Sequence, residues 1–465
     1  MAEINPSMSL SNPHPANFNA TQKTGLALVS LGVLATLFAW VNIGTVQPAI
    51  YLAVALIGYF GGGVIYSIGS YGSVPEGIKN NRAFFTSMSS RGAIAWMAGI
   101  IITLFYLFLY FKDYADKIVG GNSLGGLITM FDPISNLLRG KASDQWFVYG
   151  SFYTIAVLIM GFKFILKYRH SKYQILRTCS VMFFQLIFAW MLPGIMNNLY
   201  NYEPYWTYFF PLDYDALFPS NLSYLNSIGT LGQFTIFWGL ILTFIATPVL
   251  TYFYGKRWYC SWVCGCGGLA ETAGDPFRHL SDKSLKSWKI ERWLIHSVLA
   301  AIIIITILLL VDVSTQGALL NDKTAGILAK GYGLIIGSIF SGVIGVGFYP
   351  LMGSRVWCRF GCPMAAYLGL IQRFKSRFRI TTNGAQCISC GNCSTYCEMG
   401  IDVRWYAQRN QNIVRSSCVG CGICSAVCPR GVLKLENGPD NSKRTDIQMR
   451  TNDLVLYDDV NILSK

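Results

Sequence analysis

Charged residues are scarce in this chain. Asp, Glu, Lys and Arg together form 13% of its 465 residues, whereas hydrophobic residues form 52%. This composition is too apolar for a soluble electron carrier with extensions and indicates a protein that is embedded in a membrane. Histidine is also rare: there are four, and His296 alone falls within a long apolar stretch. A haem held between two histidines of a helix bundle is therefore not expected.

Several motifs of self-contained enzymes are missing as well. The sequence has no Walker-type phosphate loop, no G-x-S-x-G nucleophile elbow and no Rossmann fingerprint, so it does not indicate nucleotide-dependent or hydrolytic chemistry. No motif for covalent flavin attachment is evident either. We therefore identify no catalytic residue and no substrate-converting site.

Long apolar runs are what the chain does have. A helix needs about 20 mostly apolar residues to cross a bilayer. The stretches that qualify are 24–44, 49–69, 93–111, 146–166, 179–196, 235–254, 293–311 and 332–352. They predict an all-α polytopic membrane bundle of about eight transmembrane helices. Residues 1–23 are polar and lack the basic region of a signal peptide.

The distribution of Lys and Arg predicts the orientation of the bundle. Basic clusters follow the fourth, sixth and eighth stretches, at 167–177, 256–292 and 355–379, whereas the loop from Asn197 to Thr230 contains no Lys or Arg. Basic residues in short loops mark the cytoplasmic side. We therefore expect everything after the eighth stretch in the cytoplasm. The net charge of +14 then reflects topology, and nucleic-acid binding is not expected.

Two cysteine runs after the last apolar stretch predict the cofactor. They read Cys387-x-x-Cys390-x-x-Cys393-x-x-x-Cys397 and Cys418-x-x-Cys421-x-x-Cys424-x-x-x-Cys428. This is the pattern of a bacterial ferredoxin with two [4Fe–4S] clusters, in which the fourth cysteine of a run binds the other cluster. The expected ligand sets are Cys387, Cys390, Cys393 and Cys428 for one cluster and Cys418, Cys421, Cys424 and Cys397 for the other. Disulfides are disfavoured because thiols stay reduced in the cytosol.

One position departs from the ferredoxin pattern. Pro429 follows Cys428, as the pattern expects, but Glu398 follows Cys397. Proline shapes the turn and is not a ligand, so cluster binding should survive. A charge beside a cluster can tune its reduction potential, in a direction that the sequence does not reveal.

Four further cysteines belong to an internal repeat. Gly, Arg and two cysteines recur at a constant offset of 98 residues, as Gly255, Arg257, Cys260, Cys264 and as Gly353, Arg355, Cys358, Cys362. Both copies follow spans that cross in the same direction, so both should lie at the cytoplasmic face. Cysteines four apart on a helix share a face, and two such pairs could together hold a further iron–sulfur cluster or a soft metal. Redox-active thiols and inert packing are the alternatives. Cys266 could replace Cys264 as a ligand or add a fifth thiol.

Paired C-x₃-C motifs followed by a two-cluster ferredoxin resemble the membrane polyferredoxins of the NapH, NosR and CcoG type, over about residues 178–435. In that family a proline usually follows the second cysteine of both motifs. This chain keeps Pro363 but has Gly265 after Cys264. The resemblance implies a multi-pass protein of the bacterial cytoplasmic (inner) membrane with its ferredoxin domain in the cytoplasm. Nothing in the chain is long enough to be the extracytoplasmic flavin domain of the NosR members.

These observations divide the chain into five parts. They are a polar segment at 1–23, an N-terminal transmembrane module of about four helices at 24–177, a polyferredoxin-type transmembrane core at 178–372, an α+β two-[4Fe–4S] ferredoxin domain at 373–438, and a polar tail at 439–465. The first four spans do not match the core of the family that the chain resembles. We interpret them as a module for docking a partner.

The predicted function is electron transfer between the membrane, through a quinone or a membrane partner, and a redox partner. Two alternatives stay open: an assembly or maintenance factor that reduces copper or thiols for a membrane metalloenzyme, and an iron–sulfur scaffold subunit of a larger membrane complex. The aromatic loop from Asn197 to Pro219 is interpreted first as an interfacial belt. The sharper hypothesis is a quinone pocket with Glu203, Asp213 and Asp215 as proton acceptors.

Overall fold

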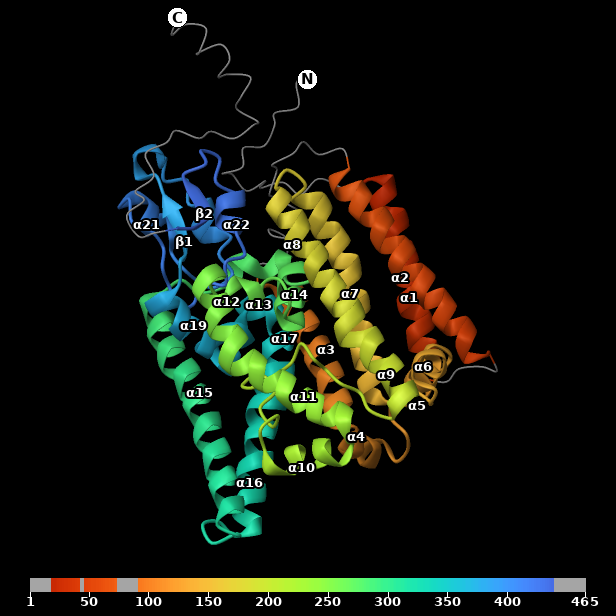
Figure 1. The fold of residues 1–465 in the computed structure, drawn as a ribbon. Helices are drawn as coiled ribbons and strands as arrows, with labels where there is room; N and C mark the ends of the chain where they lie inside the picture. Colours follow the sequence, from red (N-terminus) through yellow and green to blue (C-terminus); the bar gives the residue numbers. More distant parts are fainter. Residues whose placement is uncertain (1–17, 42–45, 73–90, 439–465) are drawn as a thin grey trace, which may run out of the picture.

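The computed structural model describes residues 18–41, 46–72 and 91–438. The predicted polar tail at 439–465 and the first 17 residues of the predicted N-terminal segment lie outside the described residues. Within the described ranges, eight helices are long and apolar enough to cross a membrane. The predicted all-α polytopic bundle with a small C-terminal ferredoxin region is confirmed (Figure 1).

The first half of the described chain supplies four of the spans. Its helices are α1 (Ala20–Val41), α2 (Pro48–Tyr71), α3 (Ala93–Tyr110), α4 (Lys112–Val119), α5 (Gly125–Met130), α6 (Asp132–Arg139) and α7 (Gln145–Lys167). Helices α1, α2, α3 and α7 are the spans. The short helices α4, α5 and α6 connect α3 to α7 at the end of the bundle opposite the C-terminal module (Figure 1).

Glycines allow α1 and α2 to pack closely. A Cβ atom on Gly62 would lie 2.6 Å from the carbonyl oxygen of Gly25, and one on Gly58 would lie 2.7 Å from the carbonyl oxygen of Leu28. Gly61, by contrast, faces open space. Small residues at helix contacts are how membrane helices bring their backbones together without a hydrophobic driving force. This part of the chain is therefore held by backbone packing.

The core consists of the remaining helices. They are α8 (Lys172–Phe183), η3 (Phe184–Met191), α9 (Leu192–Tyr200), α10 (Pro219–Ser227), α11 (Thr230–Ile241), η4 (Leu242–Ala246), α12 (Thr247–Tyr254), α13 (Arg257–Cys260), α14 (Gly265–Thr272), η5 (Asp275–Leu280), α15 (Leu285–Ser314), α16 (Asp322–Tyr332), η6 (Gly333–Ile344), α17 (Gly345–Gly347), α18 (Tyr349–Met352), η7 (Trp357–Gly361) and α19 (Pro363–Lys375). The spans α8–η3–α9, α11–η4–α12 and α16–η6–α17 each contain a π-helical segment. Such segments are frequent near functional sites. Helix α3 packs against α17 and α18, and α7 packs against α14, so the first four spans and the core form one bundle.

The aromatic loop after α9 enters the protein. The Tyr259 hydroxyl donates a hydrogen bond to the carbonyl oxygen of Thr207 over 2.7 Å, and the Phe209 ring lies 5.2 Å from the Tyr259 ring. Phe209 is buried, and the Thr243 hydroxyl donates to the carbonyl oxygen of Phe210. Phe209 is therefore packed inside the protein and does not belong to an exposed interfacial belt, whereas the belt stays a prediction for the other aromatic residues of the loop. Irregular backbone at membrane depth is tolerated where protein surrounds it.

The C-terminal module sits on the end of the bundle where α7 ends and α8 begins (Figure 1). Strand β1 (Phe378–Thr382) pairs antiparallel with β2 (Leu433–Asn437), so the two ends of the module are joined. Between the strands lie η8 (Gly384–Gln386), α20 (Asn392–Thr395), α21 (Val403–Gln408) and α22 (Ile423–Ala426). The module thus brings both cysteine runs close to the membrane-facing helices.

Candidate iron–sulfur sites

The two ferredoxin runs fold as copies of one another. Gly391 and Gly422 stand directly after the second cysteine of each run, with φ angles of 81° and 74°, and they are the N-caps of α20 and α22. Glycine adopts this left-handed conformation without steric cost. The chain can therefore turn sharply after Cys390 and Cys421 and present the third cysteine of each run beside the second.

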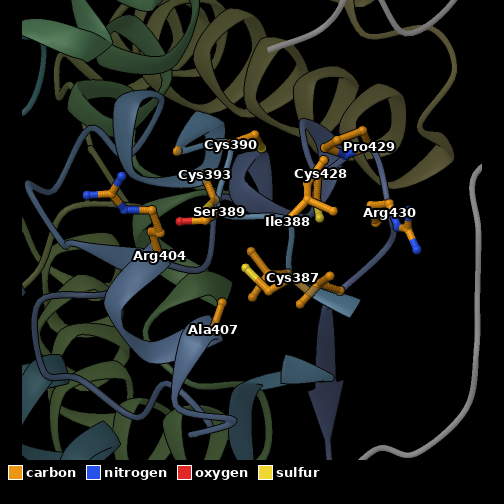
Figure 2. A pocket seen from close by; sticks show the side chains of 13 residues that line it. Cys387, Ile388, Ser389, Cys390, Cys393, Arg404, Ala407, Cys428, Pro429 and Arg430 are labelled. Carbon is orange, nitrogen blue, oxygen red and sulfur yellow. The ribbon is translucent and has the colours of Figure 1, made fainter. Parts of the chain in front are cut away.

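The first cavity brings one predicted ligand set together. Figure 2 shows the side chains around it, which include Cys387, Cys390, Cys393 and Cys428. Cys428 comes from the far end of the second run and reaches this cavity because α20 packs against α22. Arg404 and Arg430 also line it. These four cysteines are the ones predicted for one cluster.

A second cavity holds the other predicted set. Its lining includes Cys397, Cys418, Cys421 and Cys424, and Glu398 stands beside them. Burial raises the pKa of Cys421 to about 12 and that of Cys418 to about 11. These thiols are neutral until a metal ion displaces their protons. The donor set and the cavity fit an iron–sulfur cluster.

The spacing of the cysteines argues against a single zinc ion. A tetrahedral zinc site with Zn–S bonds of about 2.3 Å needs sulfurs about 3.8 Å apart. Among the residues that the structure describes, the three ligand-type atoms within 4.8 Å of one another are those of Glu271, Glu398 and Cys421. This group contains one cysteine, and arginines pair with both carboxylates. Among the described residues, the ferredoxin cysteines therefore do not form the close set of sulfurs that a single zinc ion requires.

The C-x₃-C motifs differ from the continuous helix that the spacing predicted. Cys260 is the last residue of α13, and Cys264 is the N-cap of α14 after a turn. Cys358 lies in the π-helical segment η7, and Cys362 is the N-cap of α19. Each motif is therefore a bend between two helices. The repeat is nevertheless structural, because the second cysteine of each copy stands at the N-cap position of the next helix.

The bends bring the two motifs together. Cys260, Cys264, Cys358 and Cys362 are all buried in one hydrophobic cluster. Arg355 joins the copies: its Nη1 atom lies 3.6 Å from the Cys358 Sγ atom and donates a hydrogen bond to the carbonyl oxygen of Cys260. These four positions define a joint site, the term used below. Whether they bind a metal together stays a prediction.

Cys266 lies at the edge of this joint site. Its thiol donates a hydrogen bond to Cys264 and thereby lowers the pKa of Cys264 to about 7. Cys266 is half-buried and packs against the hydrophobic cluster that holds the other four cysteines. The predicted substitution of Cys264 by Cys266 as a ligand is compatible with this position and stays a prediction.

Sequence reasoning missed a set of buried charges. Basic residues near the spans were interpreted as topology signals, but several of them are buried and ion-paired: Lys167, Arg177, Arg278, Arg355 and Arg359. Topology alone therefore does not explain the basic excess. Two signals were available: Glu398 in place of a proline, and the arginine that recurs in both repeats. Glu398 and Arg355, the arginine of the second repeat, are both buried and pair with each other.

Comparison with known proteins agrees with these sites. A family model described as a 4Fe-4S binding domain matches residues 236–284 and 334–381, the two stretches that hold the C-x₃-C motifs. A model described as a 4Fe-4S dicluster domain matches residues 386–433. The chain is an iron–sulfur membrane protein. The number of clusters and their individual ligands stay predictions.

A curated relative covers part of the chain. The putative electron transport protein YccM of Escherichia coli (strain K12) is 27% identical over 186 residues, which are 35% of this chain and 46% of that protein. The match therefore spans less than half the length of this relative. No solved structure matches the chain.

Proposed function

We propose that this protein relays electrons between a membrane quinone and a redox partner that meets the ferredoxin module, as a membrane polyferredoxin of the NapH, NosR and CcoG type. The observation that carries the proposal is the continuity of the cysteine sites. The joint site and Cys418, Cys424 and Cys428 of the module belong to one buried cluster. Bound clusters would supply the one-electron chemistry, while the protein positions them. The name of the YccM relative, a putative electron transport protein, supports electron transfer as the activity.

In this relay, the aromatic loop from Asn197 to Pro219 is the part that meets the quinone. It contacts Tyr259, the residue before Cys260, through Thr207 and Phe209. Farther along the loop, burial and a hydrogen bond with Asp215 raise the pKa of Asp213 to about 8. A carboxylate that titrates near neutral pH is suited to accept a proton from a bound quinol. Glu203 is instead engaged by Arg139 and Lys141, so we assign the proton to the aspartate pair.

Quinol should reduce the protein in a pH-dependent way. In anaerobically prepared liposomes, a short-chain quinol should bleach the visible absorbance of the clusters, and the quinone should restore it. Because Asp213 must be deprotonated to accept a proton, the rate should rise as the pH is raised through about 8. Asp213→Asn should remove this dependence, whereas Asp113→Asn, at an exposed carboxylate of α4, should preserve it.

Two outcomes would contradict this scheme. Clusters that respond to neither quinol nor quinone would refute the relay from the quinone pool. Bleaching with a flat pH profile in the unmodified protein would refute only the role of Asp213.

We propose further that the protein lies in the bacterial cytoplasmic membrane with its ferredoxin module inside. The basic segment 167–177 supports this orientation because it contacts the module: the Tyr173 hydroxyl donates to the carbonyl oxygen of Gly420 over 2.9 Å, and the Gln174 amide donates to that of Cys421 over 2.8 Å. A reporter fused after Asn226 should be active outside, and one fused after Lys283 should be active in the cytoplasm. The reverse pattern would overturn the orientation.

A further inference from the structure

Seven charged side chains are buried between the bundle and the ferredoxin module. Each is at most 4% exposed: Lys167, Arg177, Arg278, Arg355, Glu271, Asp275 and Glu398. Glu398 pairs with Arg278 at 2.7 Å and with Arg355 at 3.1 Å. Glu271 pairs with Arg355 at 2.6 Å and with Arg177. Asp275 completes the network through Lys167 at 2.5 Å and Arg278 at 2.8 Å.

Buried ion pairs are energetically unfavourable as a means of joining the bundle to the module. Removing charges from water carries a large desolvation penalty, and well-packed apolar residues of similar volume often stabilise a protein as well or better. Four of the seven groups are cationic and three are anionic, so the network carries a net positive charge. Its placement between two cysteine sites points to an electrostatic role.

Arg355 connects the two cysteine sites. On one side its Nη1 atom lies 3.6 Å from the Cys358 Sγ atom of the joint site. On the other side its guanidinium pairs with Glu271 and Glu398. Carboxylate oxygens of both glutamates lie within 4.8 Å of the Cys421 sulfur, in the second ferredoxin cavity. The Arg355 guanidinium and the carboxylates of Glu271 and Glu398 therefore lie between the two sites.

Glu398 occupies the position where the ferredoxin pattern has proline. Its side chain is turned away from solvent into the network, and its carbonyl oxygen accepts a hydrogen bond from the Ser281 hydroxyl over 2.7 Å. A proline there would leave Arg278 and Arg355 without this carboxylate. Glu398, at the position of this proline, thus forms ion pairs that join the module to the membrane bundle.

We propose that Arg355 and Glu398 are positioning residues that set the reduction potentials of the joint site and of the Cys418–Cys421–Cys424–Cys397 site, and couple the two. The proposal rests on the proposed function in one respect, that both sites hold iron–sulfur clusters. A fixed positive charge favours the reduced, more negative state of a nearby centre, and a fixed negative charge opposes it. Both effects are strong where water is excluded. Transfer between the sites is a one-electron exchange in which one site is oxidised as the other is reduced.

The test is a redox titration of the anaerobic full-length protein, followed by electron paramagnetic resonance, with iron content measured on the same samples. Arg355→Gln should lower the potentials of both sites, by at least about tenfold in the reduction equilibrium, which is about 59 mV for one electron. Glu398→Gln should shift the potential of the Cys421 site upward. Arg355→Lys keeps the charge and should restore most of the original values.

Arg139→Gln is the matched control. Arg139 is also buried and pairs with two carboxylates, Asp144 at 2.6 Å and Glu203 at 2.7 Å. It belongs to α6, at the end of the bundle opposite the ferredoxin module (Figure 1). This variant should lower stability and leave both potentials unchanged.

Opposite shifts in the arginine and glutamate variants separate charge from structural damage. Unchanged potentials in iron-replete Arg355→Gln protein would overturn the proposal, as would shifts of the same sign in Arg355→Gln and Glu398→Gln. Should Arg355→Gln fail to assemble, Glu398→Gln and Arg355→Lys carry the same comparison. Absence of iron from the unmodified joint site would refute the coupling and the relay together, whereas unshifted potentials would refute the coupling alone.

Discussion

Electron transfer from the membrane to the ferredoxin module should collapse when Cys260 and Cys358 are both replaced by serine. These residues supply one thiol from each C-x₃-C motif, and both are buried in the joint site next to Arg355. Serine oxygen is a harder and poorer ligand than thiolate for iron–sulfur centres and soft metals. Even the outer partners of metal ligands contribute about 10–100-fold. We therefore expect a loss of at least about 100-fold in the rate at which quinol reduces the module.

Two measurements distinguish a loss of electron transfer through the joint site from damage to the ferredoxin module. The iron bound by the ferredoxin cysteines should remain, and a soluble reductant should still bleach it. Cys179→Ser is the matched control, because Cys179 is exposed on α8 and belongs to neither cysteine system. A double variant that transfers electrons at the unmodified rate would remove the joint site from the pathway.

Replacing Cys393 by serine should remove one cluster from the module. Cys393 lines the first cavity together with Cys387, Cys390 and Cys428. Each [4Fe–4S] cluster contains four irons, so about four of the roughly eight irons expected for the module should be lost. The effect should extend to the second cavity, because Cys397 and Cys428 each come from the opposite run and the two runs pack through α20 and α22. Metal binding free energy is also folding free energy, so the module should lose stability.

Iron and sulfide analysis, with limited proteolysis of the module, would measure both effects. Cys179→Ser should again match the unmodified protein. Unchanged iron in the Cys393 variant would contradict the ligand assignment. Zinc without iron in anaerobically prepared unmodified protein would refute the ferredoxin assignment altogether.

The structure places the ferredoxin cysteines in the two groups that the sequence predicted, and three members of each group are near neighbours in the chain. The C-x₂-C-x₂-C-x₃-C spacing and the glycine after the second cysteine involve only a few residues. They therefore specify the local turn directly. The same reasoning was less accurate for Cys260 and Cys264. Their spacing suits one face of a helix, but the structure places a turn between them. Periodicity cannot distinguish a helix from two short helices when the stretch is this brief.

Charge was the property least accessible to sequence reasoning. In the sequence, nothing distinguishes Lys167, Arg177 and Arg355 from basic residues that mark the cytoplasmic side of a membrane protein. Their partners are Asp275, at a distance of 108 residues from Lys167, and Glu271, at 84 residues from Arg355. Nothing local specifies such pairs, because each requires two segments to meet at the end of the bundle. The burial of Phe209 could not be predicted for the same reason, because it depends on contact with Tyr259 in a distant segment.

The sequence by itself determined the class of this protein: apolar runs of membrane-spanning length specify the bundle, and thiolate spacing specifies the cofactor. Both follow from local chemistry, since hydrophobic length and ligand order are properties of short segments. Only the tertiary structure decided which cysteines meet across the repeats, that residues 207–210 turn into the protein, and that Glu398 is enclosed by Arg278 and Arg355. These features depend on contacts between distant segments, and burial turns what would be weak surface charges into strong ones by removing the water that screens them.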